Sequence, residues 1–191
     1  MSKQPPPQQA VWSQGAIFTV GHSTLPIGDF IALLQNYGVA CVADIRTVPR
    51  SRHNPQFNGD TLGDALKAKS IEYVAIPALG GLRHARKDST NTGWRNTSFR
   101  GYADYMQTEP FAEGLATLVQ TSRQQRTAIM CAEAVPWRCH RSLVADALGV
   151  RDIPAIEILS ESSYRLHKLT PFARVEGTQI TYPPEQATLR L

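Results

Sequence analysis

The segment TAIMCAEAVPWRCHRSLVADAL, residues 127–148, indicates a strand, a loop and a helix in succession. The apolar run TAIM ends in Cys131, as a buried strand does, and the loop AEAVPWR follows it. The pattern then places Cys139, His140 and Arg141 in the first turn of a helix. A strand followed directly by a helix is a unit of an α/β fold, so this segment predicts that class.

The rest of the chain repeats this alternation. The expected strands span 16–23, 39–46, 71–79, 127–133 and 155–160, and the expected helices span 27–38, 61–70, 99–107, 109–125 and 139–150. Such a pattern predicts a mainly parallel sheet of about five strands flanked by helices. We therefore expect a single α/β domain over residues 16–191, with a C-terminal hairpin turning at Gly177, and a disordered Pro/Gln-rich tail over residues 1–15.

The composition narrows the class of protein. No stretch of the 191 residues has the ~18 consecutive apolar residues of a membrane-spanning helix, so no membrane association is expected. Three cysteines without the spacing of a disulfide framework favour a reducing compartment, and we expect a cytoplasmic protein. The sequence does not indicate an oligomeric state.

Chemically distinctive residues follow four of the expected strands. They are His22 and Ser23, Asp44 and Arg46, the segment 80–84, and Cys131 with Glu133. Because right-handed crossovers bring the carboxyl ends of parallel strands to one edge of a sheet, we expect these groups to meet there. Packing residues have no reason to gather at that edge, so the convergence predicts a functional site.

The two cysteines that flank AEAVPWR have three interpretations. A helix N-terminus, helped by Arg138 and Arg141, stabilises an anion or a thiolate, which makes Cys139 the more acidic thiol while the sheet shields Cys131. Alternatively, both cysteines are small buried hydrophobic residues. Cysteine phosphatases need an arginine six positions after the cysteine, and position 137 is a tryptophan, so that cradle is not present.

A metal site is the third interpretation. Cys131, Cys139 and His140 have the donor chemistry for zinc or iron, although their spacing is not that of a CxxC knuckle. We therefore assign no residue as a metal ligand, and the sequence does not identify a cofactor.

Three residues are candidates for proton transfer. Glu133 and Asp44 each lie just past an apolar strand, where burial or a cation shifts a carboxyl pKa. The alternative for each is a salt bridge, with Arg46 or Arg50 for Asp44 and with Arg138 or Arg141 for Glu133. His22 has a suitable pKa range, and its alternative is a hydrogen-bonded structural role. Gly21 beside it is expected to let the backbone approach a ligand closely.

Positive charge is concentrated between Arg46 and Arg100. This segment has ten basic residues against four acids and includes the long glycine-containing loop 78–98. Guanidinium groups of arginines bind phosphate or carboxylate groups. Trp94 is one of several aromatic residues that alternate with Arg95 and Arg100, and a base could stack on its ring. The alternatives are a solvated basic face or a nucleic-acid-binding surface.

In several motifs the chain resembles domain-of-unknown-function family 488. The resemblance rests on TVGHST, DIRTVPRSRHNPQF, IPALGG, MCAEAVPWRCHRSLVADAL and HKLTPFA, and it covers residues 17–173. The family pattern shares Gly21, His22, Ser23, Asp44, Arg46, Pro49, Cys131, Glu133, Cys139, His140 and Arg141. The resemblance implies no particular reaction.

These observations predict an enzyme, a cysteine-dependent hydrolase or transferase, that acts on a small phosphorylated or nucleotide-like anion at the sheet edge. The catalytic candidates are Cys131, Glu133, Cys139, His22 and Asp44, and the substrate-binding candidates are Gly21, Ser23, Arg46, Arg50, Arg138, His140 and Arg141. A nucleic-acid-binding module and a metal-binding protein remain the alternatives.

Overall fold

The computed structural model describes residues 5–184. Its strands are β1 (Ile17–Gly21), β2 (Cys41–Asp44), β3 (Glu72–Ala75), β4 (Thr127–Cys131), β5 (Ala155–Ile158), β6 (Tyr164–Leu166), β7 (Arg174–Glu176) and β8 (Gln179–Thr181). Its α-helices are α1 (Ile27–Asn36), α2 (Gly59–Lys67), α3 (Thr97–Tyr105), α4 (Glu109–Gln124) and α5 (Arg141–Gly149). Short 3-10 turns cover Pro7–Gln9, Pro55–Phe57, Pro77–Leu79 and Pro136–Arg138.

The main sheet has six strands in the order β3-β2-β4-β1-β5-β6. All pairs from β3 to β5 are parallel, and β6 joins β5 antiparallel at the edge. The predicted α/β class with a mainly parallel sheet is therefore confirmed, and so is the hairpin, because β7 and β8 pair across Gly177, which has a φ of +60°. The sequence did not predict β6, which lacks an apolar run.

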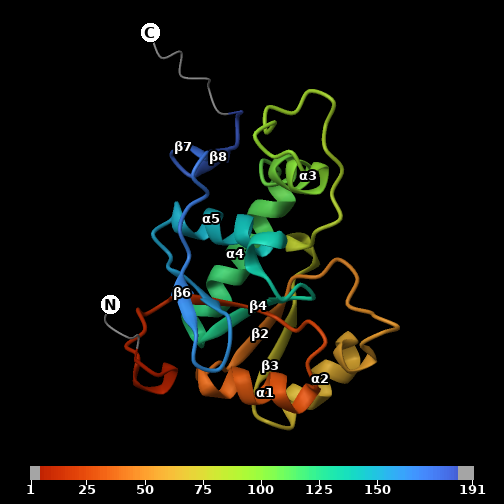
Figure 1. The fold of residues 1–191 in the computed structure, drawn as a ribbon, viewed down its shortest axis with the longest axis vertical. Helices are drawn as coiled ribbons and strands as arrows, with labels where there is room; N and C mark the ends of the chain where they lie inside the picture. The colour runs from red at the N-terminus through yellow and green to blue at the C-terminus, as the bar shows by residue number, and fades with distance from the viewer. Residues whose placement is uncertain (1–4, 185–191) are drawn as a thin grey trace.

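Two layers of helices cover the sheet because its buried strands point alternate side chains to opposite faces. In β1, Ile17 lies in the core with α3, α4 and α5, whereas Phe18 lies in the core with α1 and α2. Figure 1 shows this arrangement, with α1 and α2 on one side of the strands and α4 and α5 on the other. Strands buried on both faces explain the continuous apolar runs in the sequence.

The path of the chain across the sheet reverses its direction at one position. After β1 and β2 the chain moves toward β3 and its helices cover one face, whereas after β3 and β4 it moves toward β5 and its helices cover the other. β1 and β4 are neighbours, so their outgoing connections leave on opposite faces. Such a switch point opens a crevice outside the carboxyl ends of the two strands, and ligands of α/β proteins bind there.

The predicted tail and the long loop both contact the folded chain. Within the predicted tail, the Trp12 ring lies 5.0 Å from the Phe18 ring and 4.9 Å from the Tyr164 ring, while residues 1–4 lie outside the described residues. In the loop, Asp104 of α3 accepts hydrogen bonds from Ser89 and the buried Asn91. Both segments therefore have defined contacts with the domain.

No helix among residues 5–184 combines the length and apolar character needed to cross a membrane.

Candidate functional site

The candidate site lies where β1 and β4 end side by side. Gly21 ends β1 and pairs with Cys131, which ends β4. A Cβ at position 21 would lie 1.8 Å from the Glu133 carbonyl oxygen and 2.8 Å from Nη2 of Arg141, so only glycine fits. We expected Gly21 to admit a ligand. What approaches it instead is the loop that follows β4.

A cavity of about 720 Å³ opens at this edge of the sheet. Of the residues that the sequence singled out, its wall contains His22, Ser23, Arg46, Arg50, Cys131, Glu133, Arg138 and His140. Gly21, Asp44, Cys139 and Arg141 are not part of that wall. Several uncharged residues that line it were not among the candidates from the sequence, namely Thr24, Thr47, Val48, Ser51 and Asn54. Leu82, which also lines it, belongs to the segment 80–84 that was expected at this edge.

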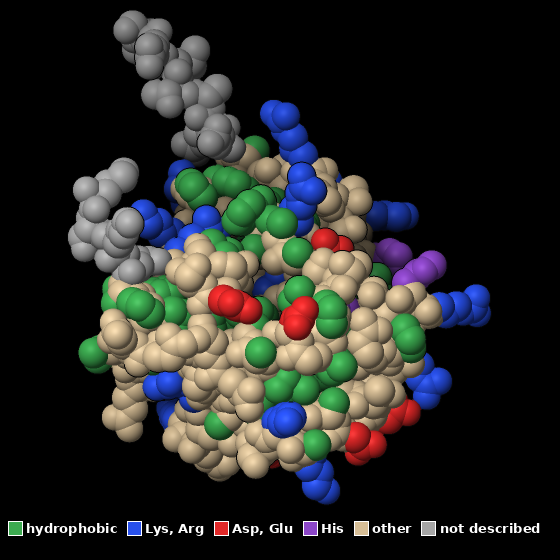
Figure 2. Space-filling model, turned by 60° about the horizontal axis from the view of Figure 1, so that its bottom comes forward, with side chains coloured by type: hydrophobic (Ala, Val, Ile, Leu, Met, Phe, Trp, Pro, Cys, Tyr) green, Lys and Arg blue, Asp and Glu red, His purple; other side chains and the backbone are tan. Residues whose placement is uncertain are grey.

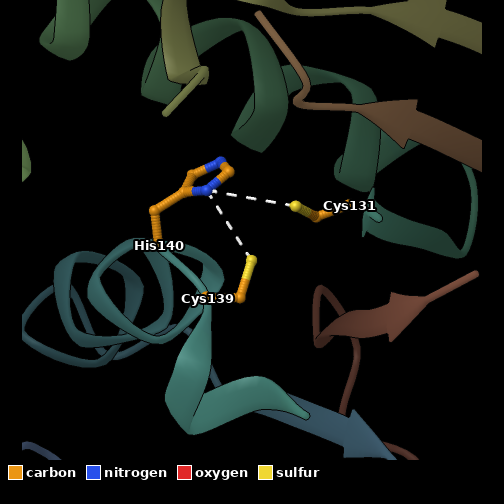
Figure 3. A group of neighbouring side chains, drawn as sticks. All are labelled: Cys131, Cys139 and His140. Carbon is orange, nitrogen blue, oxygen red and sulfur yellow. Dashed lines mark hydrogen bonds between the residues drawn. The ribbon is translucent and has the colours of Figure 1, made fainter. Parts of the chain in front are cut away.

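Two cysteines and a histidine converge at this edge of the sheet, and two of them, Cys131 and His140, line the cavity. Nδ1 of His140 lies 3.6 Å from Sγ of Cys139 and 4.0 Å from Sγ of Cys131. The three donor atoms all lie within 4.8 Å of one another. Figure 3 shows both sulfur atoms directed at the same ring nitrogen, although Cys131 comes from the end of β4 and the other two residues directly precede α5.

The second ring nitrogen of His140 fixes the orientation of the first. Nε2 lies 3.2 Å from the carbonyl oxygen of Ile45. A carbonyl oxygen only accepts hydrogen bonds, so Nε2 must carry the proton and donate it. In the neutral imidazole Nδ1 then has a free lone pair, and this lone pair faces the two sulfur atoms.

The chain brings Cys139 and His140 together through a tight turn before α5. The 3-10 turn Pro136–Arg138 ends at Cys139, whose backbone N–H donates to the Pro136 carbonyl, and His140 caps the N-terminus of α5. We predicted both residues within the first helical turn. The helix instead begins at Arg141, because the proline-initiated turn holds the two preceding residues outside it.

The two thiols share a hydrogen bond and titrate in opposite directions. That hydrogen bond lowers the pKa of Cys139 to about 6, with burial opposing it and the Arg141 guanidinium supporting it. The same bond, together with burial, raises the pKa of Cys131 to about 12. This is the order of acidity that the sequence predicts, but the acidic Cys139 lies behind the cavity wall whereas Cys131 forms part of it.

Asp44 is occupied by a buried ion pair. Its carboxylate accepts hydrogen bonds from Nε and Nη2 of Arg46, at 2.9 and 2.6 Å, and from the Tyr73 hydroxyl at 2.8 Å. Its side chain is fully buried and does not reach the cavity. The salt-bridge alternative therefore holds for Asp44, and its contacts are those of a group that positions Arg46 in the cavity wall.

His22 is also committed to neighbouring groups. Its Nδ1 lies 2.8 Å from the Ser23 carbonyl and therefore donates, and Nε2 accepts from Nη1 of Arg46 at 3.3 Å. Its ring stacks on Phe57 at 4.0 Å. Burial, supported by the charge of Arg46, lowers the pKa of His22. The geometry is that of a neutral, hydrogen-bonded histidine that holds Arg46.

Arg141 fastens the loop after β4 and does not line the cavity. Its side chain is fully buried, and Nη2 donates to the carbonyl oxygen of Glu133 at 2.5 Å. Its Nε and Nη1 have no hydrogen-bond partner among the described residues. We expected Arg141 to hold the substrate anion, but its contacts are with the loop backbone.

Glu133 accepts the hydrogen bond from Arg141 through its carbonyl oxygen and is one of the residues that line the cavity. The carboxylate is exposed, and within residues 5–184 it forms no ion pair with Arg138 or Arg141. The predicted salt bridge is therefore not found in that range.

Arg50 and Arg138 are the exposed cations of the cavity wall. They come from separate loops, one after β2 and one after β4. In the described part of the chain neither guanidinium forms an ion pair, in contrast to Arg46. Two arginines that form no ion pair with a described carboxylate therefore line this cavity.

The rest of the basic segment offers less support for binding nucleic acid. The Trp94 ring lies 4.7 Å from Phe99, 4.9 Å from Phe172 and 5.6 Å from Tyr182, so it packs in an aromatic cluster and is not free to stack on a base. Figure 2 shows one face of the molecule, on which Lys and Arg side chains are scattered among neutral ones.

Comparison with known proteins identifies the family and no activity. No curated protein and no solved structure matches the chain. A family model described as "Domain of unknown function DUF488" matches residues 26–148, from the start of α1 almost to the end of α5. This range is well over half of the chain and includes Cys131, Cys139 and His140. The chain therefore belongs to the DUF488 family, as its motifs predicted.

Proposed function

We propose that this protein is an enzyme that acts on a small phosphorylated or nucleotide-like anion bound in the cavity between the ends of β1 and β4. The observation that carries the proposal is one cavity of about 720 Å³, lined by Arg50 and Arg138 and by Cys131 and His140 of the sulfur and nitrogen cluster. Neither arginine forms an ion pair within residues 5–184. Its volume is within the range of about 300–1,000 Å³ that is usual for small-molecule sites.

The charges of the wall favour an anion. Three arginines and one acidic residue, Glu133, are among the residues that line the cavity, while Asp44 lies outside the wall and neutralises Arg46. Guanidinium groups bind phosphate through two parallel hydrogen bonds, and such charge-assisted bonds are stronger than neutral ones. Arg50 and Arg138 are therefore the groups expected to hold the substrate.

The position of the cluster suggests where the reaction occurs. Cys131 and His140 belong to both the cluster and the wall, so a substrate held by the arginines lies beside a thiol and a histidine nitrogen. Sulfur nucleophiles and metal-bound water both perform hydrolysis and group transfer. We therefore assign a hydrolase or transferase class.

Replacing Arg138 with glutamine is expected to weaken the binding of inorganic pyrophosphate by about 10- to 100-fold, because a charge-assisted hydrogen bond contributes roughly 1.5–3 kcal/mol. Isothermal titration calorimetry at fixed ionic strength measures the change. The matched control is Arg123→Gln, which removes an exposed arginine from the last turn of α4, outside the cavity wall. Equal weakening in both variants, or none in Arg138→Gln, would contradict the proposal.

The same variants separate a small-anion site from a nucleic-acid surface. Nucleic-acid binding falls steeply with salt and would respond to Arg123→Gln and Arg138→Gln alike. The binding of a small anion in the cavity is expected to weaken in Arg138→Gln and to stay unchanged in Arg123→Gln. Turnover of nucleoside phosphates, followed by phosphorus NMR, is expected for the wild type and for Arg123→Gln.

A further inference from the structure

We propose that Cys131, Cys139 and His140 together bind one divalent transition-metal ion, and that zinc fits their donor atoms best. This inference deepens the proposed function, on which it rests for the identity of the substrate. It names the reactive centre of that cavity.

The spacing of the donor atoms suits a metal ion. With Zn–S bonds of about 2.3 Å and Zn–N bonds of about 2.0–2.1 Å, a tetrahedral site separates S from N by about 3.5 Å and S from S by about 3.8 Å. The Sγ–Nδ1 distances are 3.6 and 4.0 Å, and no pair of donors is more than 4.8 Å apart. The three side chains therefore need to move together by only a fraction of an ångström to about one ångström.

The histidine is already oriented as a metal ligand. Its Nε2–H donates to the carbonyl oxygen of Ile45, so the lone pair of Nδ1 faces both sulfur atoms. Metal-binding histidines almost always donate their other ring N–H to a carbonyl or a carboxylate in this way. A histidine with a packing role alone would not need two cysteine sulfur atoms to converge on its free lone pair.

Charge balance suits a buried centre. A divalent ion that displaces one proton from each of the two thiols forms a neutral group with two thiolates and a neutral imidazole. Burial of a neutral group avoids the large cost of burying an unpaired ion. Thiolate and imidazole ligands favour zinc or iron over magnesium, calcium and manganese, which prefer oxygen.

The site also has the ligand number of a reactive centre. Structural zinc sites use four protein ligands, whereas catalytic sites use three and leave a position for water or substrate. Within residues 5–184 this group of three is the one cluster of His, Cys, Asp and Glu that could hold a metal. Cys131 and His140 line the cavity and Cys139 does not, so the open position is expected on the cavity side.

The test is the metal content of the full chain, purified without chelators and measured by elemental analysis. We expect close to one zinc or iron ion per chain in the wild type and at least a tenfold loss in Cys139→Ser. The matched control is Cys41→Ser, because Cys41 is fully buried in β2 and lies outside the cluster. Unchanged metal content in Cys139→Ser would overturn the proposal.

A second measurement guards against a variant that fails to fold. Wild-type protein stripped of metal and titrated with Co²⁺ is expected to develop intense sulfur-to-cobalt absorption and the visible bands of a tetrahedral ion. A wild type that contains no metal and gives no such bands overturns the metal site. Pyrophosphate binding that still depends on Arg138 would then leave the proposed function standing, whereas metal binding without pyrophosphate binding would remove the proposed substrate and keep the metal.

Discussion

Replacing Asp44 with alanine is expected to lower the free energy of unfolding by about 3–5 kcal/mol, because the loss of one partner leaves a buried charge uncompensated. Arg46 is 8% exposed, and Asp44 accepts three side-chain hydrogen bonds from it as well as one from its backbone N–H. Without the carboxylate, the guanidinium keeps as partners, among the described residues, only the Phe57 carbonyl and His22. Urea denaturation followed by circular dichroism measures the loss.

The control for Asp44 is an ion pair of the same kind at the surface. Arg86 and Asp88 form a salt bridge at 2.8 Å in which both side chains are mostly exposed. Exposed pairs contribute little, so Asp88→Ala is expected to leave the free energy of unfolding nearly unchanged. If the two variants lose similar amounts, the Asp44–Arg46 pair is not the buried support of the cavity wall that we infer.

The second large effect concerns pH and the C-terminal segment. His167 lies between two buried carboxylates: its Nε2 donates to Asp146 of α5 and its Nδ1 donates to Glu157 of β5, each at 2.8 Å. Burial alone would lower the pKa of His167, but the two hydrogen bonds to carboxylates outweigh burial and raise the pKa to about 9. Tyr182 also donates to Asp146, and Arg165 contacts Glu157, so the network attaches residues 164–182 to the sheet and to α5.

The direction of the pH effect follows from the two pKa values. The pKa of His167 is about 9 in the folded chain against a value of 6.5 for an unperturbed histidine, so protonation stabilises the fold fully below pH 6.5. This stabilisation, about 3 kcal/mol for such a shift, is lost as the pH rises from 6.5 through 9. Urea denaturation of the wild type at pH 6 and pH 10 is expected to show the loss.

The matched variants isolate the contribution of His167. His167→Gln is expected to be about 3 kcal/mol less stable than the wild type at pH 6 and to approach it at pH 10. His84→Gln removes an exposed histidine and is expected to follow the wild type at both values. A constant difference between the wild type and His167→Gln across this range would show that the imidazolium is not what holds the segment.

Local patterns in the sequence predicted the fold because most strands of the sheet are buried on both faces. Such strands give continuous apolar runs, and the helices between them are long enough to show their own period. β6 has no such signal, since it is short and its side chains are mostly exposed. It pairs with β5 through backbone groups, which any sequence supplies.

The site was predictable in its location but only partly in its roles. The rule that strand ends meet at one edge brought together Cys131, His22 and Arg46 from distant segments. The rule does not predict which neighbouring group each side chain contacts at that edge. Asp44 pairs with Arg46 because burying an unpaired carboxylate is costly, and the buried Arg141 donates through Nη2 to the loop backbone.

The orientation of His140 lay beyond the reach of sequence reasoning. The side chains of adjacent Cys and His residues on a helix point in different directions, so the predicted helix does not bring Cys139 and His140 together. The structure ends the proline-initiated turn at Cys139, so the two side chains converge before the helix begins. The partner that fixes the imidazole, the Ile45 carbonyl, is a backbone group 95 residues away and leaves no trace in the sequence.

The most direct test of the central claim is a crystal structure of the protein grown with tungstate, an oxyanion of the phosphate class whose anomalous signal locates it without ambiguity. The account predicts a tungstate ion in the cavity between β1 and β4, within hydrogen-bonding distance of Arg138 and beside Cys131 and His140. A cavity without tungstate, in crystals that bind the ion elsewhere or not at all, would contradict it.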